Sequence, residues 1–201
     1  MPDRDHVHTP ADSRRRGLPA IGFRLRAPAA VALEVPADGP VLLRAEERGG
    51  DDGVVGALEV TACDASLIID RDGVLEELAS DAADRVLAHP AVGRLSSIVP
   101  VELAGGPTGF RADVDLSRDA RGVRPELPCL ALYALASPDL AVSGALIVVV
   151  RSVTTEWPAA AAMMASLKVL SQRGGAGYGG AGHDDGGDDT VRLRLPVPRR
   201  R

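Results

Sequence analysis

The residues whose types and spacing could support chemistry lie first in the stretch VELAGGPTGFRADVDL, residues 101–116. Gly105, Gly106, Pro107 and Thr108 stand there between two strand-like runs. A Walker-type phosphate loop needs a lysine directly after its last glycine, followed by serine or threonine. In this stretch the last glycine is followed by FRADVDL, which contains none of these residues. Glycines that accept positive φ and a proline of fixed φ are typical of a turn. We therefore expect a hairpin turn, which is also our candidate interaction loop.

Two acidic stretches raise the question of a metal site. HDDGGDD, residues 183–189, offers carboxylates to a divalent cation, although flexible acidic linkers are far commoner than cation sites. DRDG, residues 70–73, resembles the middle of a calcium loop, but its first and last ligand positions would be Ile68 and Ala79, which lack oxygen donors. We therefore predict no metal ligand, with a cation sensor in the acidic tail as a weaker alternative.

Neither the glycines nor the histidines define a catalytic or cofactor site. Gly177, Gly179 and Gly182 match the spacing GxGxxG, but they do not lie between a strand and a helix, as a dinucleotide fingerprint requires. His89 is the histidine of the expected folded body, while the others fall in expected tails, namely His6, His8 and His183. The sequence thus nominates no catalytic residue and no cofactor, and a small enzyme or ligand-binding protein with an unrecognised carboxylate or arginine site stays open as the alternative.

Charge and composition bear on partners and location. The net charge of -5 and the scarcity of aromatic residues argue against nucleic acid, which favours basic surfaces and stacking rings. Cys63 and Cys129 are far apart and read as small core side chains. The first twenty residues lack the apolar core of a signal peptide, and the longest apolar run, 141–150, is shorter than the roughly 20 residues of a membrane helix. We expect a cytoplasmic protein without membrane insertion.

The chain divides into three parts by composition. Residues 1–19 are polar and proline-punctuated, which predicts a disordered arm. Residues 20–172 form the single expected domain, and 173–201 form a Gly/Asp-rich linker with a basic C-terminal tail. Within that tail, residues 191–198 begin with apolar residues alternating with arginines, a pattern that either returns to a sheet edge or has no structural role.

Strand-like runs dominate the expected domain, and two stretches carry a helical period instead. The first helix is expected over about 73–88, with Asp81 and Arg85 paired on its wet side. The second is expected over 156–170, with Thr155 as its N-cap. Strands are expected at 22–26, 31–35, 40–46, 54–63, 66–69, 95–103, 110–116, 129–136 and 145–153. This order predicts an α+β fold, in which a central helix and a C-terminal helix pack on an antiparallel β-sheet.

The order of elements resembles the PsbP-like α/β/α sandwich, in particular the actinobacterial LpqN-type branch. The matching stretches are FRLRAPAAVALEVP at 23–36, VPVELAGGPTGFRADVDL at 99–116, ALIVVVRSV at 145–153 and EWPAAAAMMASLKVL at 156–170. The signal peptide and lipidated cysteine of LpqN-type lipoproteins are not among the matches, so their envelope location does not transfer. The resemblance implies a bacterial, non-catalytic accessory or interaction module whose partner is another protein.

Overall fold

The computed structural model describes residues 2–50, 53–65, 70–87, 93–116, 127, 129–136, 144–154 and 156–170. Predicted features outside these ranges are the strand at 66–69, His89, the acidic stretch and the alternating run of the tail. The elements along the described chain are β1 (Arg4–His8), α1 (Pro10–Arg15), β2 (Gly22–Ala27), β3 (Val31–Glu34), β4 (Val41–Arg48), β5 (Val54–Cys63), α2 (Arg71–Leu87), β6 (Gly93–Glu102), β7 (Thr108–Leu116), β8 (Cys129–Ala136), β9 (Ala145–Ser152), α3 (Pro158–Ser166) and β10 (Lys168–Leu170).

A seven-stranded antiparallel sheet forms the centre of the molecule. Its strand order is β3-β4-β5-β9-β8-β7-β6. Strands β6 and β7 form the hairpin predicted around the glycine turn, with Glu102 opposite Thr108. Strands β8 and β9, which correspond to the strands predicted at 129–136 and 145–153, pair with each other, with Leu135 opposite Leu146. The predicted α+β fold with antiparallel strands is therefore confirmed.

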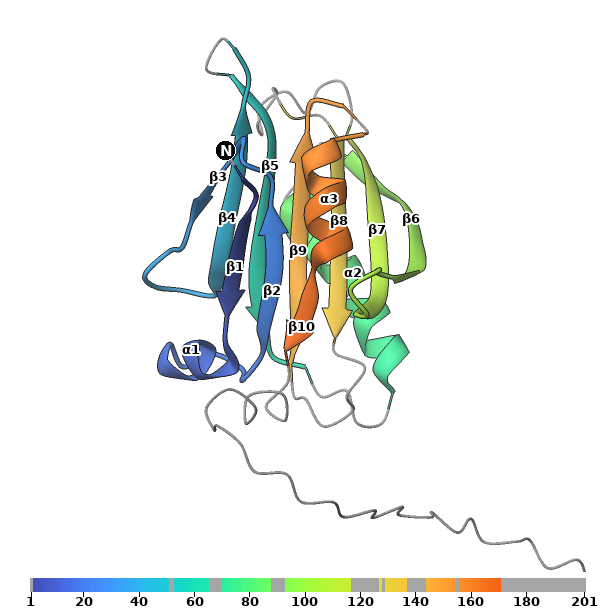
Figure 1. Ribbon diagram of the computed structural model, residues 1–201. Coiled ribbons are helices and arrows are strands. Elements are labelled where there is room, and N and C mark those ends of the chain that lie inside the picture. The colour runs from blue at the N-terminus through green and yellow to red at the C-terminus, as the bar shows by residue number, and fades with distance from the viewer. Residues whose placement is uncertain are drawn as a thin grey trace, which may run out of the picture.

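A second, three-stranded sheet lies over one face of the large sheet, so the single predicted sheet is wrong. It has the order β1-β2-β10 and is also antiparallel. Figure 1 shows this small sheet and α3 side by side in front of the large sheet, with α2 behind it. The large sheet is therefore the middle of three layers.

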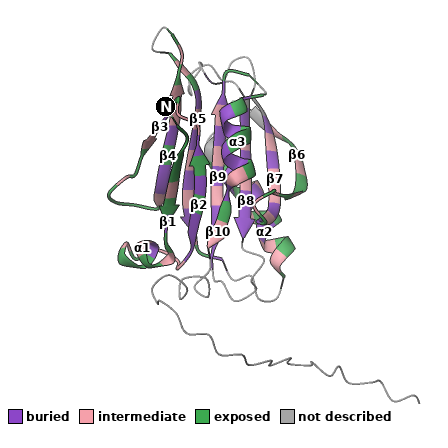
Figure 2. Ribbon diagram, in the orientation of Figure 1, coloured by how far each residue is buried: buried purple, intermediate pink, exposed green. Residues whose placement is uncertain are grey.

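Each face of the large sheet has its own hydrophobic core. The front core joins Phe23 of β2 and Met163 of α3 to Val60 of β5. The rear core joins Leu75 of α2 to Leu132 of β8. Buried and exposed residues alternate along β2, as Figure 2 shows, because successive side chains of a strand point to opposite faces. Burial of apolar surface on both faces is what holds the three layers together.

The prediction of a disordered arm over residues 1–19 is wrong. β1 pairs along its length with β2, and α1 begins at a capping box in which Thr9 and Asp12 bond each other's backbone N–H groups. At the other end of α1, Arg16 donates from Nη2 to the carbonyl oxygens of Gly39 and Val41, at 2.6 and 2.8 Å. These bonds compensate for the low apolar content of the arm, which is the property that suggested disorder.

The closing helix is shorter than predicted. The central helix agrees with expectation, since α2 covers Arg71–Leu87, but α3 ends at Ser166 and the chain continues as β10. Leu167 has the extended backbone of a C-cap, and β10 then pairs with β2. The N-cap of α3 is Trp157, not the predicted Thr155. Pairing with β2 therefore takes residues that the helical period had assigned to a last turn.

Candidate functional site

The predicted interaction loop is packed against the C-terminal part of the fold. A Cβ at Gly105 would overlap the carbonyl oxygen of Leu167, so only glycine fits this approach. Gly106 adopts a φ of 98°, and Pro107 is buried. The glycine at position 105 is therefore explained by close packing of the loop against the junction of α3 and β10.

Thr108, the last residue of the predicted loop, is held by the first residue of α2. Arg71 donates from Nη2 to Thr108 Oγ1 at 2.7 Å and, more weakly, to the carbonyl oxygen of Ala136 at 3.5 Å. The threonine hydroxyl is therefore engaged within the fold, and the bond connects α2 to the β6–β7 hairpin. The role of this loop in an interaction stays a prediction.

A serine–histidine pair lies where the sequence suggested only disordered residues. His8 Nε2 is 2.9 Å from Ser13 Oγ, and Ser13 Oγ donates to the carbonyl oxygen of Ile21 at 2.6 Å. Because the serine proton is directed to that carbonyl, Oγ accepts a hydrogen bond from the imidazole N–H. Ser13 is fully buried and His8 is 5% exposed, so the hydroxyl has no access to a substrate. The pair is a structural link between β1, α1 and Ile21, the residue that precedes β2.

Both histidines of β1 contact Phe23. The His8 ring stacks on Phe23 with centroids 5.8 Å apart, and the His6 ring lies tilted against it at 5.5 Å. Burial lowers the pKa of His6 and of His8 below the ordinary value of 6.5, and the carboxylate of Asp12 opposes this effect. The positive charge of Arg16 lowers the pKa of His8 further. Neutral imidazoles are thus part of the folded arm.

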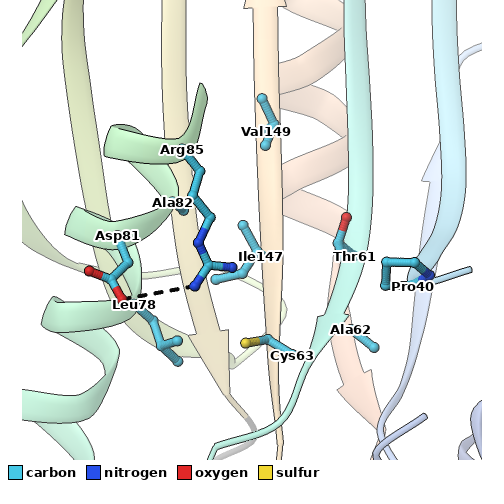
Figure 3. Close-up of a pocket in the computed structure, with 10 residues that line it drawn as sticks. All are labelled: Pro40, Thr61, Ala62, Cys63, Leu78, Asp81, Ala82, Arg85, Ile147 and Val149. Carbon is cyan, nitrogen blue, oxygen red and sulfur yellow. Dashed lines mark ion pairs between the residues drawn. The ribbon is translucent and has the colours of Figure 1, made fainter. Parts of the chain in front are cut away.

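A groove between α2 and the large sheet offers an accessible site. Its volume is about 240 Å³, and its lining includes Ile147 and Val149 of β9 together with Leu78 and Ala82 of α2. Figure 3 shows Ile147 and Val149 along the strand that faces α2. The small Ala82 side chain helps to leave this space open beside the rear core. The groove therefore has a mainly apolar floor.

β5 forms the other wall of the groove. Leu58 and Val60 of this strand belong to the front core, so the alternation of strand side chains turns Thr61 and Cys63 toward the α2 side. The backbone of β5 is paired with β4 on one side and with β9 on the other. The groove consequently presents side chains and no free strand edge, so a bound chain cannot extend the sheet there.

An ion pair on α2 borders the groove, as the sequence predicted. Arg85 Nη2 and Asp81 Oδ2 are 4.0 Å apart, and the two side chains are 77% and 53% exposed. Figure 3 shows the Arg85 guanidinium extending from α2 toward Ile147. A pair this long and this exposed contributes little to stability, so both groups remain available to a bound molecule.

Cys63 places a thiol at the end of the groove. Its Sγ donates weakly to the carbonyl oxygen of Asp64 at 3.6 Å. Burial raises the pKa of this thiol, with Asp64 and Asp81 acting in the same direction and Arg85 acting against them. The sequence interpretation of Cys63 as a core side chain overlooked the groove, because its wall residues come from segments far apart in the chain.

The described ranges contain neither a metal-binding cluster nor a membrane-spanning helix. No group of three or more histidine, cysteine, aspartate or glutamate side chains there could hold a metal ion. No helix in the same part of the chain is long and apolar enough to cross a membrane.

Comparison with known proteins gives no family for this chain. No protein-family model matches it, and no curated protein matches it. Among solved structures, a protein of Bacteroides thetaiotaomicron VPI-5482 is similar with a TM-score of 0.39 and 10% sequence identity. The match covers 86% of this chain and 50% of the other, so the chain spans about half the length of that protein. The resemblance to PsbP-like proteins remains a prediction.

Proposed function

We propose that this chain is a non-catalytic interaction module that binds an extended, apolar and basic segment of a partner protein in the groove beside α2. The observation that carries the proposal is the open apolar floor next to the exposed Asp81–Arg85 pair. A volume of about 240 Å³ is below the range of roughly 300–1,000 Å³ of sites for drug-sized ligands, which favours a few aliphatic side chains over such a ligand.

The charge of α2 favours a basic partner. Among the exposed residues of α2, acids outnumber bases. The base is Arg85, and the acids are Asp72, Glu76, Glu77, Asp81 and Asp84. The chain as a whole has a formal charge of -5. Charge complementarity of this kind steers association and fixes which partner binds. A segment that alternates aliphatic and basic residues can place one set on the groove floor and the other beside the acids.

A peptide-display selection on the immobilised full chain tests this proposal. We expect enrichment of peptides in which aliphatic and basic residues alternate, and we expect Thr61→Lys to weaken their binding at least about tenfold by filling and charging the groove. Ala57→Lys is the matched control, because Ala57 lies on the same strand, is partly exposed and does not line the groove. Selected peptides that bind the Thr61→Lys chain as well as the parent would refute the proposal.

We also propose that the fold is the PsbP-like sandwich that the sequence resembles. The arrangement of α2 and α3 on opposite faces of an antiparallel sheet supports this assignment. The same proposal includes a bacterial origin and a cytoplasmic location for this protein.

A further inference from the structure

The C-terminal tail of the chain contains a segment with the chemistry that the groove favours. Residues 190–196, TVRLRLP, alternate Val191, Leu193 and Leu195 with two arginines. In an extended chain this alternation directs the aliphatic side chains to one side and the arginines to the other. The segment is thus complementary to the apolar floor of the groove and to the acidic surface of α2 beside it.

The described chain ends in the front layer, at the same end of the large sheet as Cys63, while the groove lies on the rear side of that sheet. Leu170, the last residue of β10, lies opposite Gly22. A Cβ at Gly144 would lie 3.7 Å from the Cβ of Ile21, which precedes Gly22, and 3.5 Å from the carbonyl oxygen of Cys63. Neighbouring residues therefore connect the end of β10 with the Cys63 end of the groove.

The intervening chain is long enough to allow docking from this starting point. Residues 171–189 separate β10 from the segment and are rich in glycine. For a glycine-rich random coil of 19 residues the root-mean-square span is on the order of 25 Å, which corresponds to an effective concentration on the order of 1 mM for a tethered segment. A segment that binds the groove only weakly as a free peptide would therefore occupy it for most of the time when it is tethered to the same molecule.

We infer that residues 190–196 occupy the groove of the same chain and compete there with the partner protein. The inference rests on the proposed function, because it uses the same groove and the same ligand chemistry. Its consequence is autoinhibition, since a partner segment has to displace the tail before it binds.

The thiol of Cys63 provides a direct readout of occupancy. We use the full chain with Cys129→Ser, so that Cys63 is the one cysteine left, and measure its reaction rate with dithiodipyridine. With a dissociation constant on the order of 0.1 mM for the free segment, tethering protects the thiol about tenfold. We therefore expect Leu193→Ser with Leu195→Ser to accelerate the reaction about tenfold. Gly180→Ser with Gly182→Ser is the matched control, because it makes two neutral changes in the linker, and it should leave the rate unchanged.

A synthetic peptide of residues 190–196 separates the possible failures. Added to the Leu193→Ser, Leu195→Ser chain, it should restore protection of Cys63. Equal rates in the parent and the serine chain overturn docking of the tail. If the peptide nevertheless protects the thiol in that case, the groove binds this chemistry and the proposed function stands without autoinhibition. If it gives no protection either, the groove does not bind this segment, and the proposed function then depends on the outcome of the peptide selection alone.

Discussion

His8 and Ser13 show how single polar residues can order a chain segment of low apolar content. The Ser13 hydroxyl donates to Ile21 and accepts from His8, so one buried oxygen links β1 and α1 to the residue that precedes β2. The imidazole also stacks on Phe23. Buried polar groups are costly unless they are hydrogen-bonded, and this arrangement gives the Ser13 hydroxyl both a donor and an acceptor. Protonation of His8 would leave that bond in place, but burial disfavours the positive charge and so lowers the pKa of the imidazole.

The stability of the protein should therefore fall when the histidines of β1 become protonated. Burial lowers the pKa of His6 and of His8, so as the pH falls below about 6.5 the unfolded chain takes up protons before the folded chain does. We expect the free energy of unfolding to decrease from about pH 7 toward pH 5. Urea denaturation across this range measures it, with His6→Leu and His8→Leu combined in a variant that should lose most of the slope. An unchanged slope in that variant would contradict the assignment.

The other charged groups around the histidines do not obscure this window. Asp12 and Arg16 are the ionised groups that act on His8 from α1. Hydrogen bonds from the side chain and backbone of Thr9 lower the pKa of Asp12 to about 2. The stability that Asp12 contributes is therefore present above about pH 4 and is lost only as the pH falls toward 2.

At the scale of elements, α3 is attached to the large sheet by the residue that precedes it. Trp157 is 5% exposed and covers Gly56 of β5, where a Cβ would overlap the indole ring. The indole Nε1 donates to Glu47 Oε2 of β4 at 2.5 Å. α3 itself contains no charged side chain, so this bond fixes the polar end of an otherwise apolar attachment.

Removing the acceptor should weaken this attachment measurably. We expect Glu47→Leu to reduce the free energy of unfolding by about 1–3 kcal/mol, because it leaves the indole N–H buried without a partner. Glu47→Gln retains an oxygen acceptor and should recover most of the loss, while Glu34→Leu on the exposed edge of β3 serves as the control for adding a leucine. Urea unfolding followed by fluorescence reports directly on this residue, since Trp157 is the one tryptophan of the chain. A loss in Glu47→Gln as large as in Glu47→Leu would refute the role of the hydrogen bond.

At the scale of the whole molecule, local signals in the sequence predicted more than long-range ones. The hairpin at 95–116 could be predicted because its turn residues and apolar alternation are adjacent in the chain. The ordered arm could not, since it depends on His6 and His8 meeting Phe23 across a sheet. The groove could not be predicted from the sequence either, because it results from small side chains on α2 and β5 that come together only after the layers pack. The ion pair of Asp81 and Arg85 was predictable from helical spacing alone.

The three layers should unfold as one unit, because the middle sheet contributes to both cores. Leu75 of α2 is fully buried in the rear core, and we expect Leu75→Ala to reduce the free energy of unfolding by about 2–5 kcal/mol. Urea unfolding followed by far-ultraviolet circular dichroism and by Trp157 fluorescence should shift to the same lower midpoint, although Trp157 lies in the front core. Glu76→Ala, at the exposed neighbouring position of α2, should change the free energy by less than about 0.5 kcal/mol. If the fluorescence midpoint stayed at the parent value while the dichroism midpoint fell, α2 would unfold independently of the front layer. The groove between α2 and the sheet would then open without loss of the rest of the fold.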